Sequence, residues 1–165
     1  MAEAQEQPQF NIEKLYVKDI SLESPNTPDL FLEQSAPEVE LKLFNQGKLA
    51  GENLYEVSLT VTLTAKMGER TAYLVEVAQA GLFRISNVTE EMLGMIIQIT
   101  CPNILFPYAR EAVSEMIGRA GYQPIFLAPV NFEALYQQQR EQQAQQAQQA
   151  QQAQQAQAAA PATIQ

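Results

Sequence analysis

Two neighbouring stretches of the chain alternate between hydrophobic and polar residues. From Tyr55 onward, residues 53–66 carry Tyr, Val, Leu or Ala at odd positions and Glu, Ser, Thr or Lys at even positions. Residues 71–85 alternate in a similar way. A period of two is typical of a β-strand with one buried and one solvated face. Because residues 67–70 contain Gly68 and two charged residues, we expect a turn there and an antiparallel hairpin between the two strands.

Two more strands are predicted nearer the N-terminus. Residues 38–44 alternate, with a Val and two Leu on the side that is expected to face the core. Residues 10–23 alternate with two changes of phase, one near residues 13–14 and one near residues 18–19. A change of phase within a strand indicates a β-bulge or a bend.

The segment between these two strands, residues 24–37, contains three prolines. Proline lacks an N–H and restricts the residue before it, so we expect neither a helix nor a central strand here. The segment is too long for a hairpin turn. Its hydrophobic residues 30–32 need to be covered by another part of the chain.

Helices are predicted in the second half of the chain. Thr89 is a suitable N-cap and is followed by two glutamates, which favour the start of a helix. Pro102 is expected to end this helix and to begin a second one, which ends at Gly121. Asn131 is expected to cap a last helix beginning at Phe132. Because the strands precede the helices, the predicted fold class is α+β.

The chain divides into three parts by composition. Residues 1–9 form a polar leader that we expect to be disordered, and residues 10–136 carry nearly all the aromatic and branched side chains. Residues 137–165 form a low-complexity Gln/Ala tail in which alanine recurs at every third position. A period of three does not match the 3.6 residues of a helical turn, so the tail has no fixed apolar stripe and no coiled-coil pattern. We interpret it as a solubilising extension, helical in its first turns; a flexible arm that touches partners is the alternative.

Composition excludes several kinds of active site. The chain has no histidine, one cysteine and a net charge of −9. It therefore has no Ser-His-Asp or Cys-His nucleophile, no imidazole acid or base, no internal disulfide and no cysteine zinc cluster. Cys101 is interpreted as a buried structural thiol. We expect no enzyme activity, no metal and no cofactor.

Charge and hydropathy also limit the partners and the location. An acidic surface repels phosphate backbones, so nucleic acid is not expected as a partner, whereas basic or apolar partners are. The N-terminus has no signal-peptide pattern, and the most apolar run, residues 92–99, is too short to span a bilayer. A single cysteine fits a reducing compartment. We therefore expect a cytoplasmic protein without direct membrane insertion.

One group of residues predicts an acidic face on the sheet. Allowing for the changes of phase, we expect five residues to share one side of the first strand: Leu15, Val17, Asp19, Ser21 and Glu23. Leu74 and Glu76 are expected on the exposed side of the strand over residues 71–85. If the two strands are neighbours, these residues form an acidic surface with an apolar centre. Such a surface serves more often for solubility than for binding.

A second group places hydrophobic residues in predicted loops. Residues 30–32 follow two prolines, and residues 125–127 lie between two others. Part of this apolar surface packs on the fold. The rest predicts a groove between the proline-rich loop and the last helix, suited to an apolar guest.

Three motifs of this chain stand out: CPNILFPYARE at residues 101–111, LAPVNFEAL at residues 127–135 and YVKDISLESPN at residues 16–26. Together, they resemble the SecB family, the tetrameric export chaperones of bacteria. The resemblance extends from residue 10 to residue 136. It implies a four-stranded antiparallel sheet with helices packed on one face, and a tetramer built as a dimer of dimers through the first long helix.

The resemblance also implies a function and its residues. The family holds unfolded precursor proteins without ATP and delivers them to the motor ATPase SecA. The residues implied for SecA binding are Asp19, Glu23, Leu74 and Glu76. The residues expected to line the client-binding groove are Pro25, Pro28, Leu30, Phe31, Phe126, Leu127 and Phe132. The residues expected at the oligomer interface are Cys101, Ile104, Leu105 and Phe106.

Two alternative functions are compatible with parts of this picture. A SecB-like chaperone dedicated to one partner, such as the antitoxin of a toxin–antitoxin module, would have the same fold. The acidic residues Asp19, Glu23 and Glu76 favour the SecA-linked role instead. An α+β isomerase that uses an Asp and a Tyr would need an acid and a base in separate environments, and the sequence shows no such pair.

Overall fold

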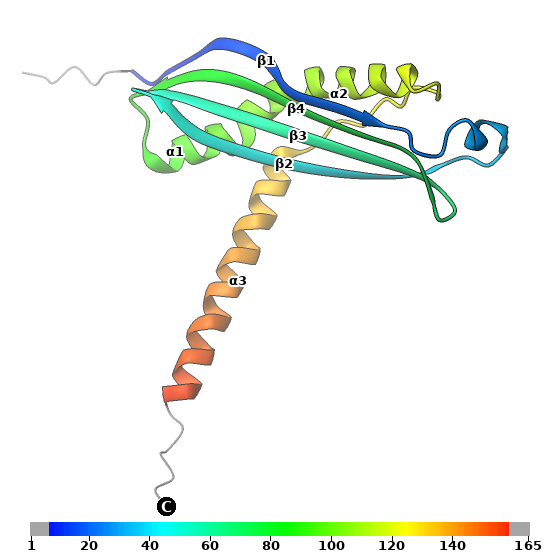
Figure 1. Cartoon of the computed structure of the whole chain (residues 1–165). Coiled ribbons are helices and arrows are strands. Elements are labelled where there is room, and N and C mark those ends of the chain that lie inside the picture. Colours follow the sequence, from blue (N-terminus) through cyan, green and yellow to red (C-terminus); the bar gives the residue numbers. More distant parts are fainter. Residues whose placement is uncertain (1–6, 159–165) are drawn as a thin grey trace, which may run out of the picture. The chain divides into compact units, whose positions relative to one another are not determined.

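The computed structural model describes residues 7–158, and its first part is a four-stranded antiparallel sheet with helices on one face (Figure 1). The spatial order of the strands is β1-β4-β3-β2. The strands are β1 (Gln9–Glu23), β2 (Glu38–Gly51), β3 (Leu54–Met67) and β4 (Arg70–Ser86). The helices are η1 (Asp29–Leu32), α1 (Glu90–Met95), η2 (Ile96–Thr100), α2 (Cys101–Arg119) and α3 (Phe132–Ala158). The predicted α+β class and antiparallel sheet are confirmed.

The β3–β4 hairpin forms as its alternation predicts. Gly68 takes a positive φ of 62° in the turn, a conformation that glycine adopts without steric cost. The strand predicted over residues 38–44 is longer than expected and runs to Gly51. Residues 45–51 have little intrinsic preference for a strand, but they pair with β3 along its length. Pairing with a neighbouring strand therefore outweighs local propensity.

The two irregularities predicted in β1 are confirmed, but one assignment of its faces is wrong. The register shifts between Ile12 and Lys14 and again between Val17 and Asp19. Val17 pairs with Gln79, which is buried on the helix-covered side. Val17, and Leu15 two positions before it, therefore face the helices rather than the acidic side. The bulge after Val17 reverses the phase, so that Asp19, Ser21 and Glu23 point the other way.

The core lies between the two central strands and the helix layer. On β3 and β4 the helix-facing side chains are buried, among them Leu59, Leu63 and Val77. α2 packs mainly on these two strands. The helix-facing residues of the edge strands remain open: Ile12, Ile20, Val39 and Leu41 are 46%, 42%, 43% and 39% exposed. One helix thus covers the centre of the sheet and leaves apolar side chains uncovered along both edges.

The helix that was expected to break at Pro102 continues through it. α1, η2 and α2 follow one another without a gap from Glu90 to Arg119. η2 is a π-helical turn, in which Cys101 donates its N–H to the carbonyl of Ile96, five residues earlier. This wider turn accommodates Pro102, which follows Cys101 and has no N–H to donate. The prediction of two separate helices is therefore wrong, whereas the Thr89 cap is confirmed, because its hydroxyl accepts from the Met92 N–H at 3.2 Å.

Asn45 of β2 replaces a hydrogen bond that Pro102 removes. The Cys101 N–H is already used, and Pro102 has no N–H, so the helix offers the Ile97 carbonyl no donor from these positions. Asn45 Nδ2 donates to that carbonyl at 3.0 Å and to Gln98 Oε1 at 3.1 Å. The edge strand β2 is thereby attached to the helix layer.

The proline-rich segment contains one helical turn, contrary to the prediction. Pro28 precedes the 3-10 turn η1, where its missing N–H leaves no bond unmade. Within the turn, Phe31 donates its N–H to the Pro28 carbonyl at 3.0 Å. Leu30 is buried, so the turn delivers one of the three hydrophobic residues to the core.

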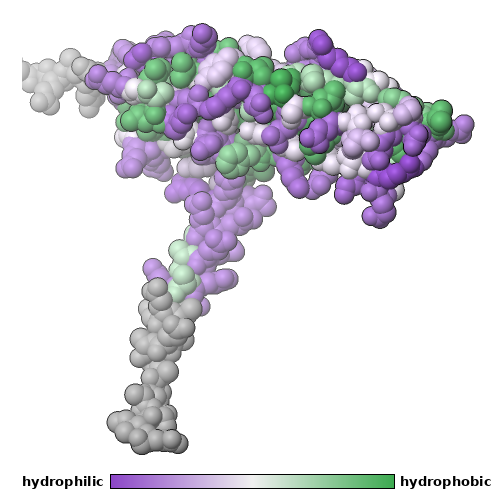
Figure 2. Space-filling view, in the orientation of Figure 1, coloured by the Kyte–Doolittle hydropathy of each residue, from purple (hydrophilic) through white to green (hydrophobic). Residues whose placement is uncertain are grey.

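The chain divides after Val130 into two compact units, and α3 lies in the second. The predicted cap is confirmed, because Asn131 Oδ1 accepts from the Ala134 N–H at 3.0 Å. The helix continues to Ala158 through most of the Gln/Ala tail, well beyond the few turns expected, because Ala and Gln are both good helix formers. The coloured part of α3 is mostly hydrophilic (Figure 2). Residues 1–6 of the expected leader and residues 159–165 of the tail lie outside the described part of the chain.

The helix over Glu90–Arg119 is long and apolar enough, by length and composition alone, to cross a membrane. Packing on the sheet accounts for part of that composition, since 28% of its most apolar stretch is buried. Cys101, Leu105, Val113 and Ile117 are all buried in the core.

Replacing Asn45 should weaken the fold. Asn45→Ala removes the donor to the partly buried Ile97 carbonyl, and the loss of this hydrogen bond costs about 0.5–1.5 kcal/mol. Denaturant unfolding followed by circular dichroism measures this loss. Gln46→Ala, an exposed change at the next residue of β2, is the matched control and should leave the midpoint almost unchanged. Equal midpoints for both variants would contradict the role of Asn45.

Candidate functional site

The sheet face opposite the helices, here called the outer face, gathers the residues predicted to bind SecA. The strand registers place Glu23, Leu74 and Thr64 in one row across the sheet. The next rows contain Ser21, Glu76, Thr62 and Lys42, and then Asp19, Ala78, Thr60 and Phe44. The four predicted residues therefore lie within three consecutive rows. On the central strands these rows consist of Leu74, Glu76 and Ala78 of β4 beside three threonines of β3.

The carboxylates of the outer face differ in how they are held. Asp19 and Glu23 are exposed, and within residues 7–152 no Lys or Arg nitrogen lies within ion-pair distance of either. Glu76 is half-buried and accepts a hydrogen bond from the Thr62 hydroxyl at 2.9 Å. Leu74 is also half-buried. The surface therefore presents uncompensated negative charge around an apolar side chain.

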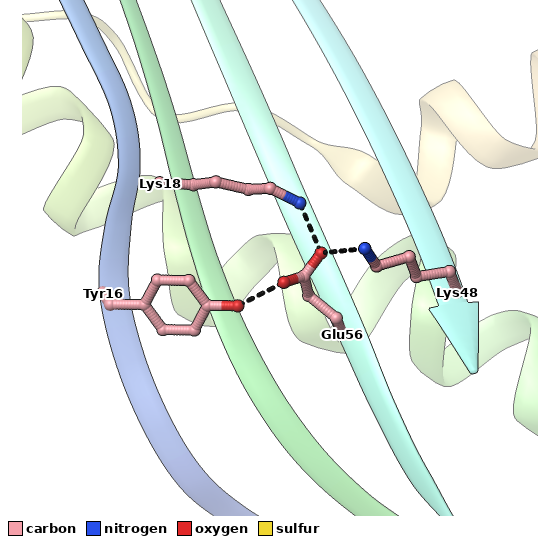
Figure 3. Close-up of polar contacts among 4 residues, drawn as sticks. All are labelled: Tyr16, Lys18, Lys48 and Glu56. Atoms are coloured by element: carbon pink, nitrogen blue, oxygen red, sulfur yellow. Dashed lines mark hydrogen bonds and ion pairs between the residues drawn. The ribbon is translucent and has the colours of Figure 1, made fainter. Parts of the chain in front are cut away.

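A second group on the outer face, the Glu56 cluster, consists of Tyr16, Lys18, Lys48 and Glu56 (Figure 3). Tyr16 donates its hydroxyl to Glu56 Oε2. Lys18 Nζ and Lys48 Nζ lie 2.6 Å and 3.2 Å from Glu56 Oε1. The four side chains come from β1, β2 and β3, and those of β1 reach across β4 to meet Glu56. The cluster thus connects both edge strands to a central strand.

The donors around Glu56 change the ionisation of the cluster. The hydrogen bonds from Lys18 and then Tyr16 lower the pKa of Glu56 to about 2. Burial, followed by the hydrogen bond to Glu56, raises the pKa of Tyr16 to about 12. Because the folded pKa of Glu56 lies below its ordinary value of 4.5, its stabilising effect is complete above pH 4.5 and is lost as the pH falls toward 2. Tyr16 keeps its proton and remains a donor throughout that range.

Sequence reasoning did not find the Glu56 cluster. Glu56 stands among Ser and Thr on a solvated strand face, a position where a glutamate usually serves only solubility. Its partners are 8 to 40 positions away in the chain, and only the strand registers bring them together. The change of phase near Lys18 was the one available signal.

The helix side of the sheet carries an apolar cavity at the edge of β2, here called the edge groove. Its volume is about 370 Å³. It is lined by Pro37, Val39, Tyr73, Tyr122, Gln123, Pro124 and Ile125. The Tyr122 ring lies between two others, 4.8 Å from Tyr73 and 5.1 Å from Phe31 between ring centres. Tyr73 and Tyr122 form an aromatic wall of the groove. Val39 of β2, which is 43% exposed, also lines it.

The residues predicted for the client groove are placed differently from the expectation. Leu30 and Leu127 are buried, so neither offers a surface to a guest. The Phe31 ring contacts Tyr122, which lines the edge groove. Phe126 is 82% exposed and lines a separate cavity of about 470 Å³ beside α2. Pro25 and Pro28 are exposed in the loop, and Phe132 is the first residue of α3 in the second unit.

None of the residues that line the edge groove, including the aromatic Tyr73 and Tyr122, is in the set predicted for the client groove. Tyr73 is buried on the helix side of β4, and its ring also borders the cavity. Whether a core-facing side chain borders a cavity depends on how far the helix layer extends, and the strand pattern carries no such information.

The residues predicted at the oligomer interface lie mostly inside the chain. Cys101, Leu105 and Phe106 are 0%, 0% and 5% exposed, because Cys101 and Leu105 belong to the helical stripe that packs on β3 and β4. These three therefore present almost no surface outside the chain, and the oligomer interface stays a prediction. Ile104 is half-buried. The apolar side chains that this helix does expose are Met92, Met95 and Tyr108.

Cys101 is buried in the core. Burial raises the pKa of the Cys101 thiol to about 12, so it stays protonated and unreactive at neutral pH. In the part of the chain that the structure describes, no group of three His, Cys, Asp or Glu side chains is arranged to hold a metal ion.

Comparison with known proteins shows the family. Residues 3–143 match the family model of the Preprotein translocase subunit SecB. The chain is 61% identical over 137 residues to the Protein-export protein SecB of Dechloromonas aromatica, covering 83% of this chain and 90% of that relative. It is 58% identical over 141 residues to the protein of the same name from Chromobacterium violaceum, covering 85% and 94%.

A solved structure agrees with the fold. The SecB-like chaperone of Mycobacterium tuberculosis, in complex with a peptide from an antitoxin, superposes with a TM-score of 0.62 at 19% identity. The match covers 73% of this chain and 90% of that one. Together with the family match and the sequence relatives, the α+β sheet described above shows that this chain belongs to the SecB family of protein-export chaperones.

Proposed function

We propose that this chain is a holdase, a chaperone that binds unfolded precursor proteins without ATP and passes them to SecA for export. The observation that supports holding is the uncovered apolar edge of β2. Val39 and Leu41 are 43% and 39% exposed, and Val39 lines the edge groove with Tyr73 and Tyr122. Unfolded chains expose apolar segments of the kind that such a groove buries.

The size of the groove limits the affinity of one contact. A cavity of about 370 Å³ admits only a few side chains, so each contact is weak. Several grooves acting on one long client give a higher combined affinity. We therefore include in the proposal that four copies assemble, with the exposed Met92, Met95 and Tyr108 of the long helix contributing to contacts between copies.

The outer face is the proposed docking surface for SecA. Asp19 and Glu23 carry free negative charge beside Leu74 and Glu76, and the chain has a net charge of −9. These features suit a cationic partner surface with an apolar centre. The edge groove opens on the other side of the sheet, so a client and SecA can bind at the same time.

Removing the apolar side chains at the groove should weaken holding. The double variant Val39→Ser, Leu41→Ser loses apolar area worth roughly tenfold in client affinity. Suppression of aggregation of two unrelated unfolded proteins, followed by light scattering, measures the effect. The matched control is Leu49→Ser, an exposed apolar change on the same side of β2 outside the groove, and it should act like the parent chain. Equal activity of both variants would place the client site elsewhere, and activity toward only one protein would indicate a dedicated chaperone.

Reversing charge on the outer face should prevent SecA binding. Asp19→Lys with Glu76→Lys changes two of the proposed docking residues, so binding should be lost while client holding is retained. The control, Glu52→Lys with Glu69→Lys in the two turns, makes the same change in net charge and should reduce binding only slightly. Binding of the parent should weaken as salt rises, because exposed charges are screened over about 8 Å at physiological ionic strength. Docking at this face is refuted if both double variants bind SecA equally well.

A further inference from the structure

The β-bulge in β1 places a cation next to a proposed docking carboxylate. In a regular strand, consecutive residues point to opposite faces, but the register shifts between Val17 and Asp19. Lys18 occupies the shift and reaches Glu56 on the outer face, and Asp19 pairs with Ala78 on the same face. Lys18 and Asp19 are therefore sequence neighbours that share one surface.

Lys18 nevertheless pairs with Glu56 and not with its neighbour. Its Nζ lies 2.6 Å from Glu56 Oε1, and the ion pairs of the described residues include none for Asp19. Glu56 is itself held in place, because Tyr16 donates to its second oxygen and Lys48 lies 3.2 Å from the first. Only 13% of the Glu56 side chain is exposed, so this carboxylate is shielded from water more than Lys18, which is 43% exposed. Figure 3 shows Lys18 extended across β4 toward β3.

We propose that Glu56 is a positioning residue of the docking surface: it holds Lys18 away from Asp19 and so keeps the Asp19 carboxylate free for a cationic partner. The inference rests on the proposed function, in which the outer face docks SecA. Glu56 acts through Lys18, without touching the partner. It prevents a Lys18–Asp19 ion pair within the chain, which would compete with the ion pair between Asp19 and the partner.

The competition follows from the flexibility of lysine. Without a negative charge at position 56, the long Lys18 side chain is released beside Asp19 on the same face. An ion pair between Lys18 and Asp19 must break before a partner can bind the Asp19 carboxylate. An exposed ion pair is weak, so the expected effect is a partial loss of affinity and not its abolition.

The test compares variants in SecA binding by calorimetry. Glu56→Gln keeps the size of the side chain and an acceptor for Tyr16 but removes the charge, so the Kd should rise about threefold to fivefold. Adding Lys18→Gln in the same chain removes the competitor and should return the Kd to near the parent value. Glu13→Gln is the matched control, because it breaks the Glu13–Arg84 pair and changes net charge equally. It should leave the Kd close to that of the parent.

The double variant separates positioning from a merely structural role. If Glu56 only stabilised the sheet, Lys18→Gln would not restore binding, and that result overturns the proposal. A Kd for Glu56→Gln no higher than that of Glu13→Gln also overturns it.

A crystal structure of the Glu56→Gln variant tests the same inference without SecA. Lys18 Nζ should lie within about 4 Å of an Asp19 carboxylate oxygen. Lys18 remaining beside residue 56 refutes the proposal, whatever SecA does. If the parent chain does not bind SecA, the docking function fails, and this crystal structure still decides whether Glu56 controls Lys18.

Discussion

One helix is too narrow to cover all four strands of the sheet, so apolar side chains stay exposed along its edges. Neighbouring strands lie about 4.8 Å apart, so four of them span roughly 14 Å between the outer axes, whereas a helix with its side chains is about 10 Å wide. α2 accordingly buries β3 and β4 and leaves Val39 of β2 and Ile20 of β1 partly open to solvent. A fold that ended there would carry apolar edges with no partner. In the proposed function, these edges bind other chains.

The same constraint separates the two sides of the sheet. The helix side offers apolar area beside an aromatic wall, and the outer face offers small polar residues with free carboxylates. Apolar burial changes little with salt, while exposed charge contacts weaken with it, so the two sides suit different partners under the same conditions. The Glu56 cluster lies on the outer face and joins side chains of β1, β2 and β3. The placement of the two edge strands therefore affects where the charged side chains of this face lie.

The features that could be predicted from the sequence are those set by local physics. The alternation of β3 and β4, the caps at Thr89 and Asn131 and the two irregularities of β1 each depend on a few adjacent residues. The features that could not be predicted depend on distant partners. Pro102 is a helix breaker by every local rule, and Asn45, more than 50 positions away, supplies the missing hydrogen bond. The burial of Cys101 was predicted and is confirmed, but which of residues 30–32 is buried, and the aromatic wall of the edge groove, follow from how far the helix layer extends, which no strand pattern records.

In the proposed function, unfolded chains bind along the uncovered helix-side edge of β2. Hydrogen exchange of backbone amides, measured with and without a saturating unfolded protein, tests this binding site. Protection should increase in the segments that line the edge groove, residues 37–41 and 122–125, and should change little in β3, whose amides already pair with both neighbouring strands. Protection confined to other segments, with residues 37–41 and 122–125 exchanging as in the free protein, would contradict it.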